Sequence, residues 1–183
     1  MNIISTNFEG LYILEPTVFE DHRGFFMESY NARVMKDHGI DYSFVQDNQS
    51  KSSYGVLRGL HFQNPPYAQT KLIRVLFGNI LDAVVDLRKS SKTYGQSFTI
   101  ELSADNKKQL LIPRGFAHGF SVLTDAAEIL YKCDNYYNKE SEGGLMYNDE
   151  FLNIDWKISN EHVIISPKDM KLSSFNDLNS NFV

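Results

Sequence analysis

The segment RGLHFQ at residues 58–63 places an arginine and a histidine in an otherwise apolar run. An imidazole in such a position can be a buried structural group, a metal ligand or a general base, because histidine titrates near neutral pH and its nitrogens bind metals. Leu60 and Phe62 flank His61 and favour a buried strand at this point of the chain. The rest of the chain must therefore decide which of the three roles the histidine has.

The relative direction of the two polar side chains in this segment depends on a bend. In a regular strand side chains alternate, so Arg58 and His61 would face opposite sides of the sheet. Gly59 lies between them and permits a bulge that turns the chain. We therefore expect a bend at Gly59 that brings both side chains to one site.

Two further charged residues, Lys71 and Asp82, lie in alternating apolar runs at 71–77 and 80–87. The dipeptide Gly78-Asn79 between the runs is a strong signal for a two-residue hairpin turn. Within such a hairpin, alternation divides the side chains between two faces. The face with both charges comprises Lys71, Ile73, Val75, Ile80, Asp82 and Val84, and the opposite face comprises Leu72, Leu76, Leu81, Ala83 and Val85.

The pattern leaves two interpretations of this charged face open. In one, the charged face is exposed to solvent and the opposite face forms the core. In the other, the strands belong to a barrel whose interior is polar because it holds a ligand. A later run, AEILYKCDNYY at 127–137, alternates in the same way and puts on one side Ala127, Ile129, Tyr131, Cys133, Asn135 and Tyr137.

The chain as a whole has the pattern of a mainly β protein. Short apolar or alternating runs recur between turn residues, which indicates a sandwich or barrel. One helix is expected from an N-cap at Asn31 to Gly39, and a second near the C-terminus has only weak signals. The length fits a single domain. Its expected parts are a β core at about 10–140, a C-terminal segment at 141–172 and a polar, mobile tail at 173–183.

The composition excludes several classes of protein. Hydrophobic residues make up 42% and charged residues 22% of the chain, which is typical of soluble globular proteins. The net charge of −5, without a block of Lys and Arg, argues against a nucleic acid partner. No segment reaches the roughly 18 apolar residues of a membrane span, and the N-terminus lacks a signal-peptide pattern. With Cys133 as the single cysteine, these features predict a cytoplasmic protein.

Five ordered motifs lie between residues 21 and 169, within a resemblance to known proteins that extends from about residue 2 to 172. They are DHRGFFMESYN at 21–31, FVQDNQSKSSYGVLRGLHFQNPPYAQTKLIRVLFGNILDAVVDLRKSS at 44–91, LIPRGFAHGF at 111–120, YKCDNYYNKESEGG at 131–144 and ISPKD at 165–169. In these motifs the chain closely resembles the dTDP-4-dehydrorhamnose 3,5-epimerases, a family of the cupin superfamily. The resemblance implies a mainly β, cupin-type jelly-roll barrel with a few short helices.

The resemblance also implies a reaction. Members of the family are isomerases that act on dTDP-4-dehydro-6-deoxy-D-glucose and invert C3 and C5, giving dTDP-4-dehydro-L-rhamnose. The product belongs to dTDP-rhamnose biosynthesis, which supplies carbohydrates such as the O-antigen of lipopolysaccharide. Both carbons flank the C4 ketone, so each inversion can pass through an enolate, and the resemblance implies that no cofactor is needed.

Four residues match the chemical groups of the family. The base, the histidine of the R-G-L-H motif, corresponds to His61, and its carboxylate partner corresponds to Asp169. Such a partner fixes the tautomer of the ring and stabilises the imidazolium. Lys71 matches the group that stabilises the oxyanion at C4, and Tyr131 matches the acid on the opposite face of the sugar.

The resemblance further implies a set of binding residues and a homodimer. Arg23 and Arg58 match the diphosphate contacts, for which forked guanidinium donors are suited, and Tyr137 matches the residue that stacks on thymine. In dimers of the family, part of each site comes from the N-terminal strand of the neighbouring subunit, so Arg23 is expected to act there with Phe26. Other positions expected to line the nucleotide or sugar site are Glu28, Gln46 and Asn48.

A metal-dependent cupin enzyme is one rival to this interpretation. His118 ends the segment PRGFAH at 113–118, whose spacing matches a cupin metal motif, but His61 lacks the H-x-H pair and glutamate of the other motif, so no metal is expected. His118 is instead expected to bind substrate or support the pocket, and Asp82 to orient Lys71 or bind a sugar hydroxyl. The sequence is also compatible with a non-catalytic sugar-nucleotide-binding jelly roll and with an epimerase that acts at C3 or C5 alone.

Overall fold

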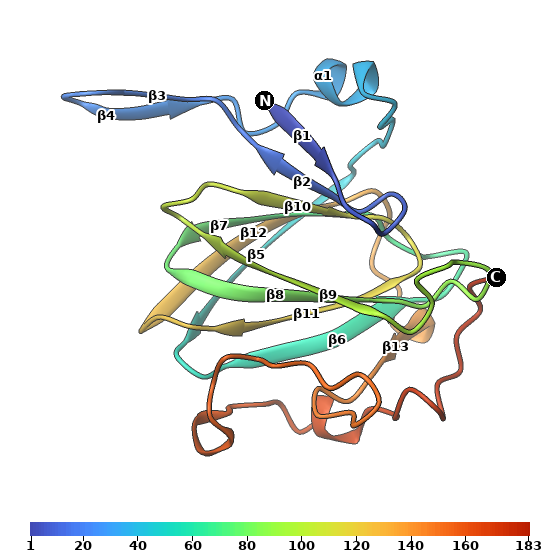
Figure 1. The fold of residues 1–183 in the computed structure, drawn as a ribbon. Helices are drawn as coiled ribbons and strands as arrows, with labels where there is room; N and C mark the ends of the chain where they lie inside the picture. Colours follow the sequence, from blue (N-terminus) through green and yellow to red (C-terminus); the bar gives the residue numbers. More distant parts are fainter.

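Two antiparallel sheets face each other and enclose a barrel, as Figure 1 shows. The computed structural model describes residues 1–183. One sheet has six strands in the order β1-β2-β10-β7-β12-β5, and the other has five strands in the order β13-β6-β11-β8-β9. The architecture confirms the predicted mainly β, cupin-type jelly roll.

The elements have the following bounds. The six-stranded sheet contains β1 (Asn2–Ser5), β2 (Tyr12–Glu15), β10 (Gln109–Ile112), β7 (Lys71–Phe77), β12 (Ala126–Cys133) and β5 (Gln46–Ser53). The five-stranded sheet contains β13 (Glu142–Gly144), β6 (Leu57–Gln63), β11 (Phe116–Val122), β8 (Asn79–Asp86) and β9 (Ser97–Ser103). Outside them lie the hairpin of β3 (Val18–Asp21) and β4 (Gly24–Met27), the helix α1 (Ala32–Asp37), and the 3-10 turns η1 (Lys139–Ser141), η2 (Asn160–His162) and η3 (Asp169–Lys171).

The inward faces of the two sheets form the main core. Ile73 of β7 and Val84 of β8 are both fully buried in one apolar cluster between the sheets. Because side chains alternate along a strand, Lys71 lies on the same face of β7 as Ile73, and Asp82 on the same face of β8 as Val84. The interior of the barrel is therefore polar at these two positions, which confirms that the charged face lies inside a barrel; that this interior holds a ligand stays a prediction.

The predicted hairpin between β7 and β8 is wrong. β7 pairs with β10 and β12, whereas β8 pairs with β11 and β9 of the other sheet. Gly78 has a φ of +75° and turns the chain from one sheet to the other, at a point where a Cβ would lie 2.1 Å from the carbonyl oxygen of Ala126. A Gly-Asn dipeptide supplies positive φ in a hairpin turn and at a corner between sheets alike, so it does not distinguish the two.

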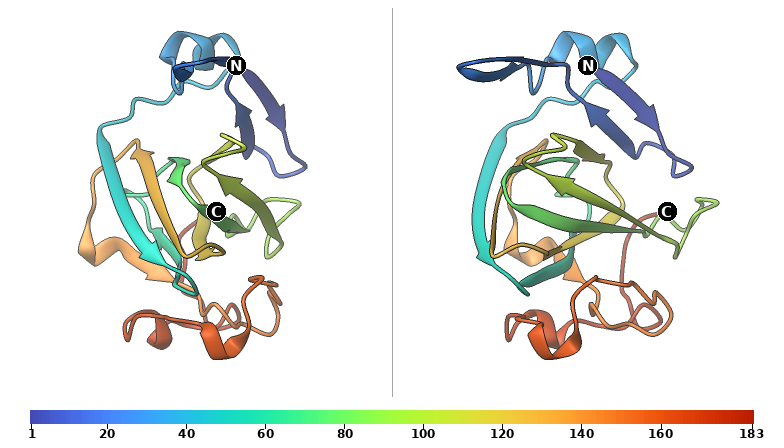
Figure 2. Two further views of the ribbon diagram at one scale, coloured as in Figure 1. Left: turned by 90° about the vertical axis from the view of Figure 1, so that its left-hand side faces the viewer. Right: turned by 60° about the vertical axis from the view of Figure 1, so that its left-hand side comes forward.

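Both sheets are also covered on their outer faces. Figure 2 shows α1 above one sheet and the C-terminal segment below the other. Leu72 of β7 packs with Met35 of α1, and Val85 of β8 packs with Trp156 of the C-terminal segment. The face opposite to the charged one is therefore buried as well, because the barrel lies between two further layers.

The predicted helix forms where expected. The side-chain oxygen of Asn31 accepts hydrogen bonds from the backbone N–H groups of Arg33 and Val34, which makes it the N-cap of α1. The helix ends at Asp37, just before His38 and Gly39. The C-terminal part of the chain forms only 3-10 turns, and none of the helices has the length and apolar character needed to cross a membrane.

The C-terminal residues pack on the protein and contradict the expected mobile tail. The ring of Phe182 contacts Phe62 of β6 edge-on, and the ring of Phe175 stacks on Phe151. Phe175 and Phe182 are 9% and 7% exposed. Burial of one such side chain stabilises a fold by about 1.5–3 kcal/mol. Two buried aromatic residues can therefore hold a mostly polar tail against the protein.

Candidate active site

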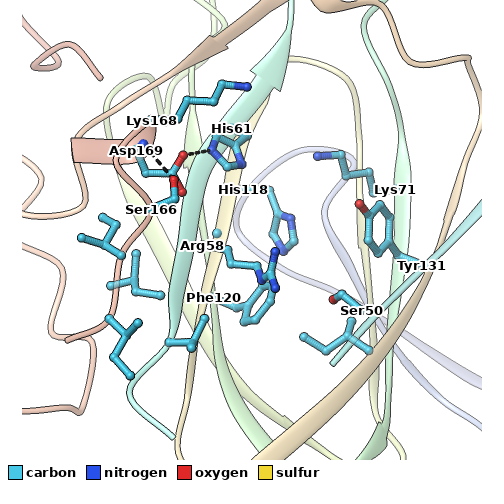
Figure 3. Close-up of a pocket in the computed structure, with 16 residues that line it drawn as sticks. Ser50, Arg58, His61, Lys71, His118, Phe120, Tyr131, Ser166, Lys168 and Asp169 are labelled. Atoms are coloured by element: carbon cyan, nitrogen blue, oxygen red, sulfur yellow. Dashed lines mark hydrogen bonds and ion pairs between the residues drawn. The ribbon is translucent and has the colours of Figure 1, made fainter. Parts of the chain in front are cut away.

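A cavity of about 530 Å³ opens between the facing sheets and the C-terminal segment. Figure 3 shows that His61, Lys71, His118 and Tyr131 point into it. His61 lies on β6 and His118 on β11, whereas Lys71 and Tyr131 lie on β7 and β12 of the opposite sheet. The cavity therefore places the predicted base on one wall and the predicted lysine and acid on the facing wall.

A bulge in β6 brings Arg58 to the same cavity as His61. Opposite β11, Arg58 pairs with Phe120 and His61 pairs with His118, so β6 has one residue more than β11 between the two pairs. Gly59 within this bulge has a φ of +119°, and a Cβ there would lie 2.7 Å from the carbonyl oxygen of His118. Both polar side chains line the cavity as a result, which confirms the predicted bend.

His61 is paired with a carboxylate from the C-terminal segment. Its Nε2 lies 2.7 Å from Oδ1 of Asp169, although 108 residues separate the two in the chain. Asp169 is only 4% exposed, and its backbone N–H donates a hydrogen bond to the hydroxyl of Ser166. A carboxylate at Nε2 favours the tautomer with its proton there, so Nδ1 is the nitrogen free to accept a proton.

The surroundings of His61 favour its neutral form. Burial lowers the pKa of His61 below its ordinary value, while the hydrogen bond and the charge of Asp169 act in the opposite direction. The positive charges of Lys71 and Lys168 lower the pKa further, because they disfavour a second cation nearby. A lowered pKa leaves the ring neutral at pH 7, which is the state that a general base requires.

Replacement of Asp169 by asparagine is expected to move the acid limb of the pH profile of kcat/KM to lower pH and to lower kcat by about 100-fold. The carboxylate raises the pKa of His61, so its removal lowers that pKa. Because activity requires the neutral ring, activity then persists to lower pH before it falls. Loss of tautomer control accounts for the lower kcat. An acid limb that moves to higher pH would contradict the pairing, and D155N on the exposed Asp155 is the control.

Lys71 and Tyr131 are both partly buried, and this shifts their pKa values away from those of the free side chains. Burial lowers the pKa of Lys71, and nearby groups, including the carboxylates of Asp82 and Glu142, oppose this change. The amine of Lys71 forms neither an ion pair nor a hydrogen bond with another residue. Burial also raises the pKa of Tyr131, so its phenol remains protonated at neutral pH and can donate a proton.

A second histidine–carboxylate pair lies beside the first. Nε2 of His118 is 2.9 Å from Oδ2 of Asp82, which is fully buried. His118 lines the cavity, as expected, but Asp82 does not. The carboxylate therefore supports His118 from behind, where the sequence suggested a contact with Lys71 or with a sugar hydroxyl.

A second cavity of about 340 Å³ adjoins the first. The two share His61, Lys71 and Tyr131 as lining residues. Tyr137, at the mouth of the second cavity, is 56% exposed, so its ring is open to a stacking partner. The predicted binding residues that line the second cavity are Gln46, Asn48 and Tyr137.

Sequence analysis missed two charged residues at these cavities, Glu142 and Lys168. Lys168 lines the first cavity and Glu142 the second, and their side chains form an ion pair of 2.6 Å. The pair joins β13 to the C-terminal segment beside His61. Both residues lie inside the motifs at 131–144 and 165–169, and that position was the signal that could have found them.

The remaining predicted binding residues lie on or next to the β3–β4 hairpin, away from the cavities. Figure 1 shows this hairpin projecting from the barrel. Phe26 is 70% exposed, Arg23 pairs with Asp21 at the turn, and Glu28 is exposed just after β4. One chain alone does not bring these residues to His61, which is consistent with the expectation that they act in a neighbouring subunit.

The side chains around the cavity are a poor set of donors for a metal ion. His61 and His118 lie opposite each other on β6 and β11, but Nε2 of each ring already bonds a carboxylate. No group of three or more His, Cys, Asp and Glu side chains is arranged to hold an ion. That the protein needs no metal stays a prediction.

Known proteins resemble this chain over nearly its whole length. The model of the family described as dTDP-4-dehydrorhamnose 3,5-epimerase matches residues 5–177. The dTDP-4-dehydrorhamnose 3,5-epimerase of Escherichia coli (strain K12) is 52% identical over 180 residues, which are 97% of this chain and 96% of that protein. The crystal structure of the enzyme of the same name from Elizabethkingia anophelis NUHP1 has a TM-score of 0.93 and 53% identity, and the match covers 98% of both chains.

A further relative was solved with a bound nucleotide sugar. The dTDP-6-deoxy-D-glucose-3,5-epimerase from Legionella pneumophila Philadelphia 1, in complex with dTDP-4-keto-L-rhamnose, has a TM-score of 0.93 and 47% identity. The match covers 97% of this chain and 94% of that chain. Sequence, fold and length thus agree across these comparisons. This chain belongs to the dTDP-4-dehydrorhamnose 3,5-epimerase family.

Proposed function

We propose that the cavity beside His61 inverts C3 and C5 of dTDP-4-dehydro-6-deoxy-D-glucose and so forms dTDP-4-dehydro-L-rhamnose. The protein is an isomerase of the dTDP-rhamnose route. The observation that carries the assignment of residues is the His61–Asp169 pair on one wall, with Tyr131 and Lys71 on the facing wall (Figure 3). A base and an acid on opposite sides of a bound sugar are what an inversion requires.

In the proposed reaction, Nδ1 of His61 removes a proton from a carbon beside the C4 ketone. The ring is neutral before this step because burial lowers its pKa, and Asp169 stabilises the imidazolium that forms. The hydrogens at C3 and C5 of the D-gluco ring lie on one face of the sugar. A single base on that face therefore serves both carbons.

The facing wall completes each inversion. As the proton leaves, negative charge develops on the C4 oxygen, and the ammonium group of Lys71 stabilises it in a site with little water. Tyr131 then gives its phenolic proton to the carbon from the face opposite to His61. Return of the proton to the original face would regenerate the substrate, so the position of Tyr131 across the cavity determines the outcome.

The nucleotide part of the substrate is proposed to extend toward Tyr137, whose exposed ring can stack on thymine. Arg58 contacts the diphosphate in this proposal. The projecting hairpin supports a homodimer in which Arg23 and Phe26 of one subunit reach the site of the other. The free thiol of Cys133 agrees with a reducing compartment and supports a cytoplasmic location.

Incubation of the protein with the substrate in heavy water tests this function. We expect deuterium at both C3 and C5 and a product with inverted configuration at both carbons, since each abstracted proton is replaced from solvent-exchanged groups. Nuclear magnetic resonance of the product measures both properties. Deuterium at C3 alone would indicate a mono-epimerase, and no deuterium at either carbon would reject an epimerase.

A further inference from the structure

In the proposed function, His61 and Tyr131 must return to their starting protonation states between the two inversions. The first inversion converts His61 into an imidazolium and Tyr131 into a phenolate. The second inversion, on the same bound sugar, again requires a neutral imidazole and a protonated phenol. Between the two inversions His61 must therefore lose one proton and Tyr131 must gain one.

We propose that Lys71 carries this proton and so resets the site between the first and the second inversion. This inference rests on the proposed roles of His61 and Tyr131. The same amine would then have two roles: it stabilises the C4 oxyanion, and it carries the proton between the two inversions.

The position of Lys71 supports the transfer. Of all residues that line the two adjoining cavities, only His61, Lys71 and Tyr131 line both. Lys71 pairs across the strands with Cys133, two residues from Tyr131, so both side chains lie on the same face of neighbouring strands. Figure 3 shows the side chains of Lys71 and Tyr131 on the same wall of the cavity, across from His61.

The state of the amine also suits a carrier. The side chain of Lys71 has no ion-pair or hydrogen-bond partner, so its four-carbon stem is free to move the amine between two partners. Burial lowers the pKa of Lys71, which eases loss of a proton. The carboxylate of Asp82 opposes this effect, and its Oδ1 is buried without a hydrogen-bond partner. Both the ammonium and the amine are thus accessible states.

The transfer balances in two steps. An N–H bond of the Lys71 ammonium breaks, its electron pair stays on Nζ, and the proton forms an O–H bond with the Tyr131 phenolate. The neutral amine then takes the proton from Nδ1 of His61, which restores the ammonium and leaves the ring neutral. No oxidant, reductant or further reactant takes part.

Neighbouring groups are less suited to this transfer. The ring of His118 is held by its bond of 2.9 Å to the buried Asp82. The guanidinium of Arg58 donates a hydrogen bond from Nε to the hydroxyl of Ser52, and arginine side chains do not act as proton carriers in proteins. Lys168 is engaged in an ion pair with Glu142. Lys71 is therefore the free titratable group between the base and the acid.

The test compares the rates of the two inversions within one turnover. Enzyme in excess over substrate is mixed in heavy water, and deuterium at C3 and C5 is followed over time for wild type, Lys71→Arg and Lys71→Met. Because both inversions develop charge on the same C4 oxygen, loss of oxyanion stabilisation scales both rates alike. The ratio of the second rate to the first therefore isolates the reset. We expect this ratio to fall by about 100-fold in both variants, with release of singly inverted sugar.

Arginine and methionine serve different purposes here. Arginine keeps a positive charge but does not release a proton, whereas methionine keeps the length of the side chain without charge. Binding of dTDP confirms that each variant is folded, and Lys132→Arg, on the outer face of neighbouring β12, is the matched control. Equal loss of both rates in both variants, or an unchanged ratio in either, would overturn the relay. If His61→Ala still exchanged deuterium, the proposed function itself would fail.

Discussion

Replacement of His61 by alanine is expected to reduce deuterium exchange at both C3 and C5 by about 10²–10⁴-fold, which is the usual contribution of a general base. The physical reason is that one ring serves both carbons, so its removal takes away the proposed base, the ring that Asp169 holds, for both inversions at once. Exchange is measured by mass spectrometry of substrate incubated in heavy water.

Binding of dTDP should persist in this variant, because the proposed nucleotide contacts lie elsewhere. A titration with dTDP, followed by calorimetry, separates loss of the base from loss of the fold. His38→Ala is the matched control, since His38 is exposed at the end of α1. Exchange that survives at either carbon in His61→Ala would show that another group is the base for that carbon.

Replacement of Tyr131 by phenylalanine is expected to separate exchange from inversion. His61 can still remove a proton, exchange it with heavy water and return a deuteron to the same face of the sugar. We therefore expect deuterium in recovered substrate, while inversion falls by about 10²–10⁴-fold because the opposite face has lost its acid. Nuclear magnetic resonance distinguishes labelled substrate from inverted product.

The change removes one oxygen atom and leaves the ring, which packs against the main core. The fold should therefore be preserved, and an unchanged melting temperature would verify this. Tyr94→Phe, at a tyrosine outside both cavities, controls for the loss of a hydroxyl group. Normal inversion by the Tyr131 variant would mean that water or another side chain supplies the proton.

Side-chain alternation predicted much of the barrel interior. Lys71 and Ile73 were placed on one face by the period of the strand alone, and the structure puts both inside the barrel. The pairing between strands could not be predicted from this alternation. Gly78 supplies a positive φ that suits a hairpin and a corner equally. No nearby residue indicates whether the next strand pairs with the preceding one or crosses to the other sheet.

Contacts between distant parts of the chain had no local signal. Asp169 meets His61 across 108 residues, and its role was suggested by the family resemblance and not by periodicity. The tail was misjudged for a similar reason. Phe175 and Phe182 are isolated among polar residues, so no amphipathic pattern predicts that they are buried. Each nevertheless packs against an aromatic ring in another part of the chain.

His61 and Asp169 lie on parts of the protein that differ in how many backbone hydrogen bonds hold them to the barrel. β6 is bonded on both sides within its sheet, whereas the segment before Asp169 meets the barrel through few backbone bonds, among them those between Leu57, Gly55 and Ile164. Such a segment opens at a lower free energy than the barrel unfolds. We therefore expect heating to detach this segment and end activity before the barrel unfolds, so that a tighter barrel core would raise the melting temperature without prolonging activity.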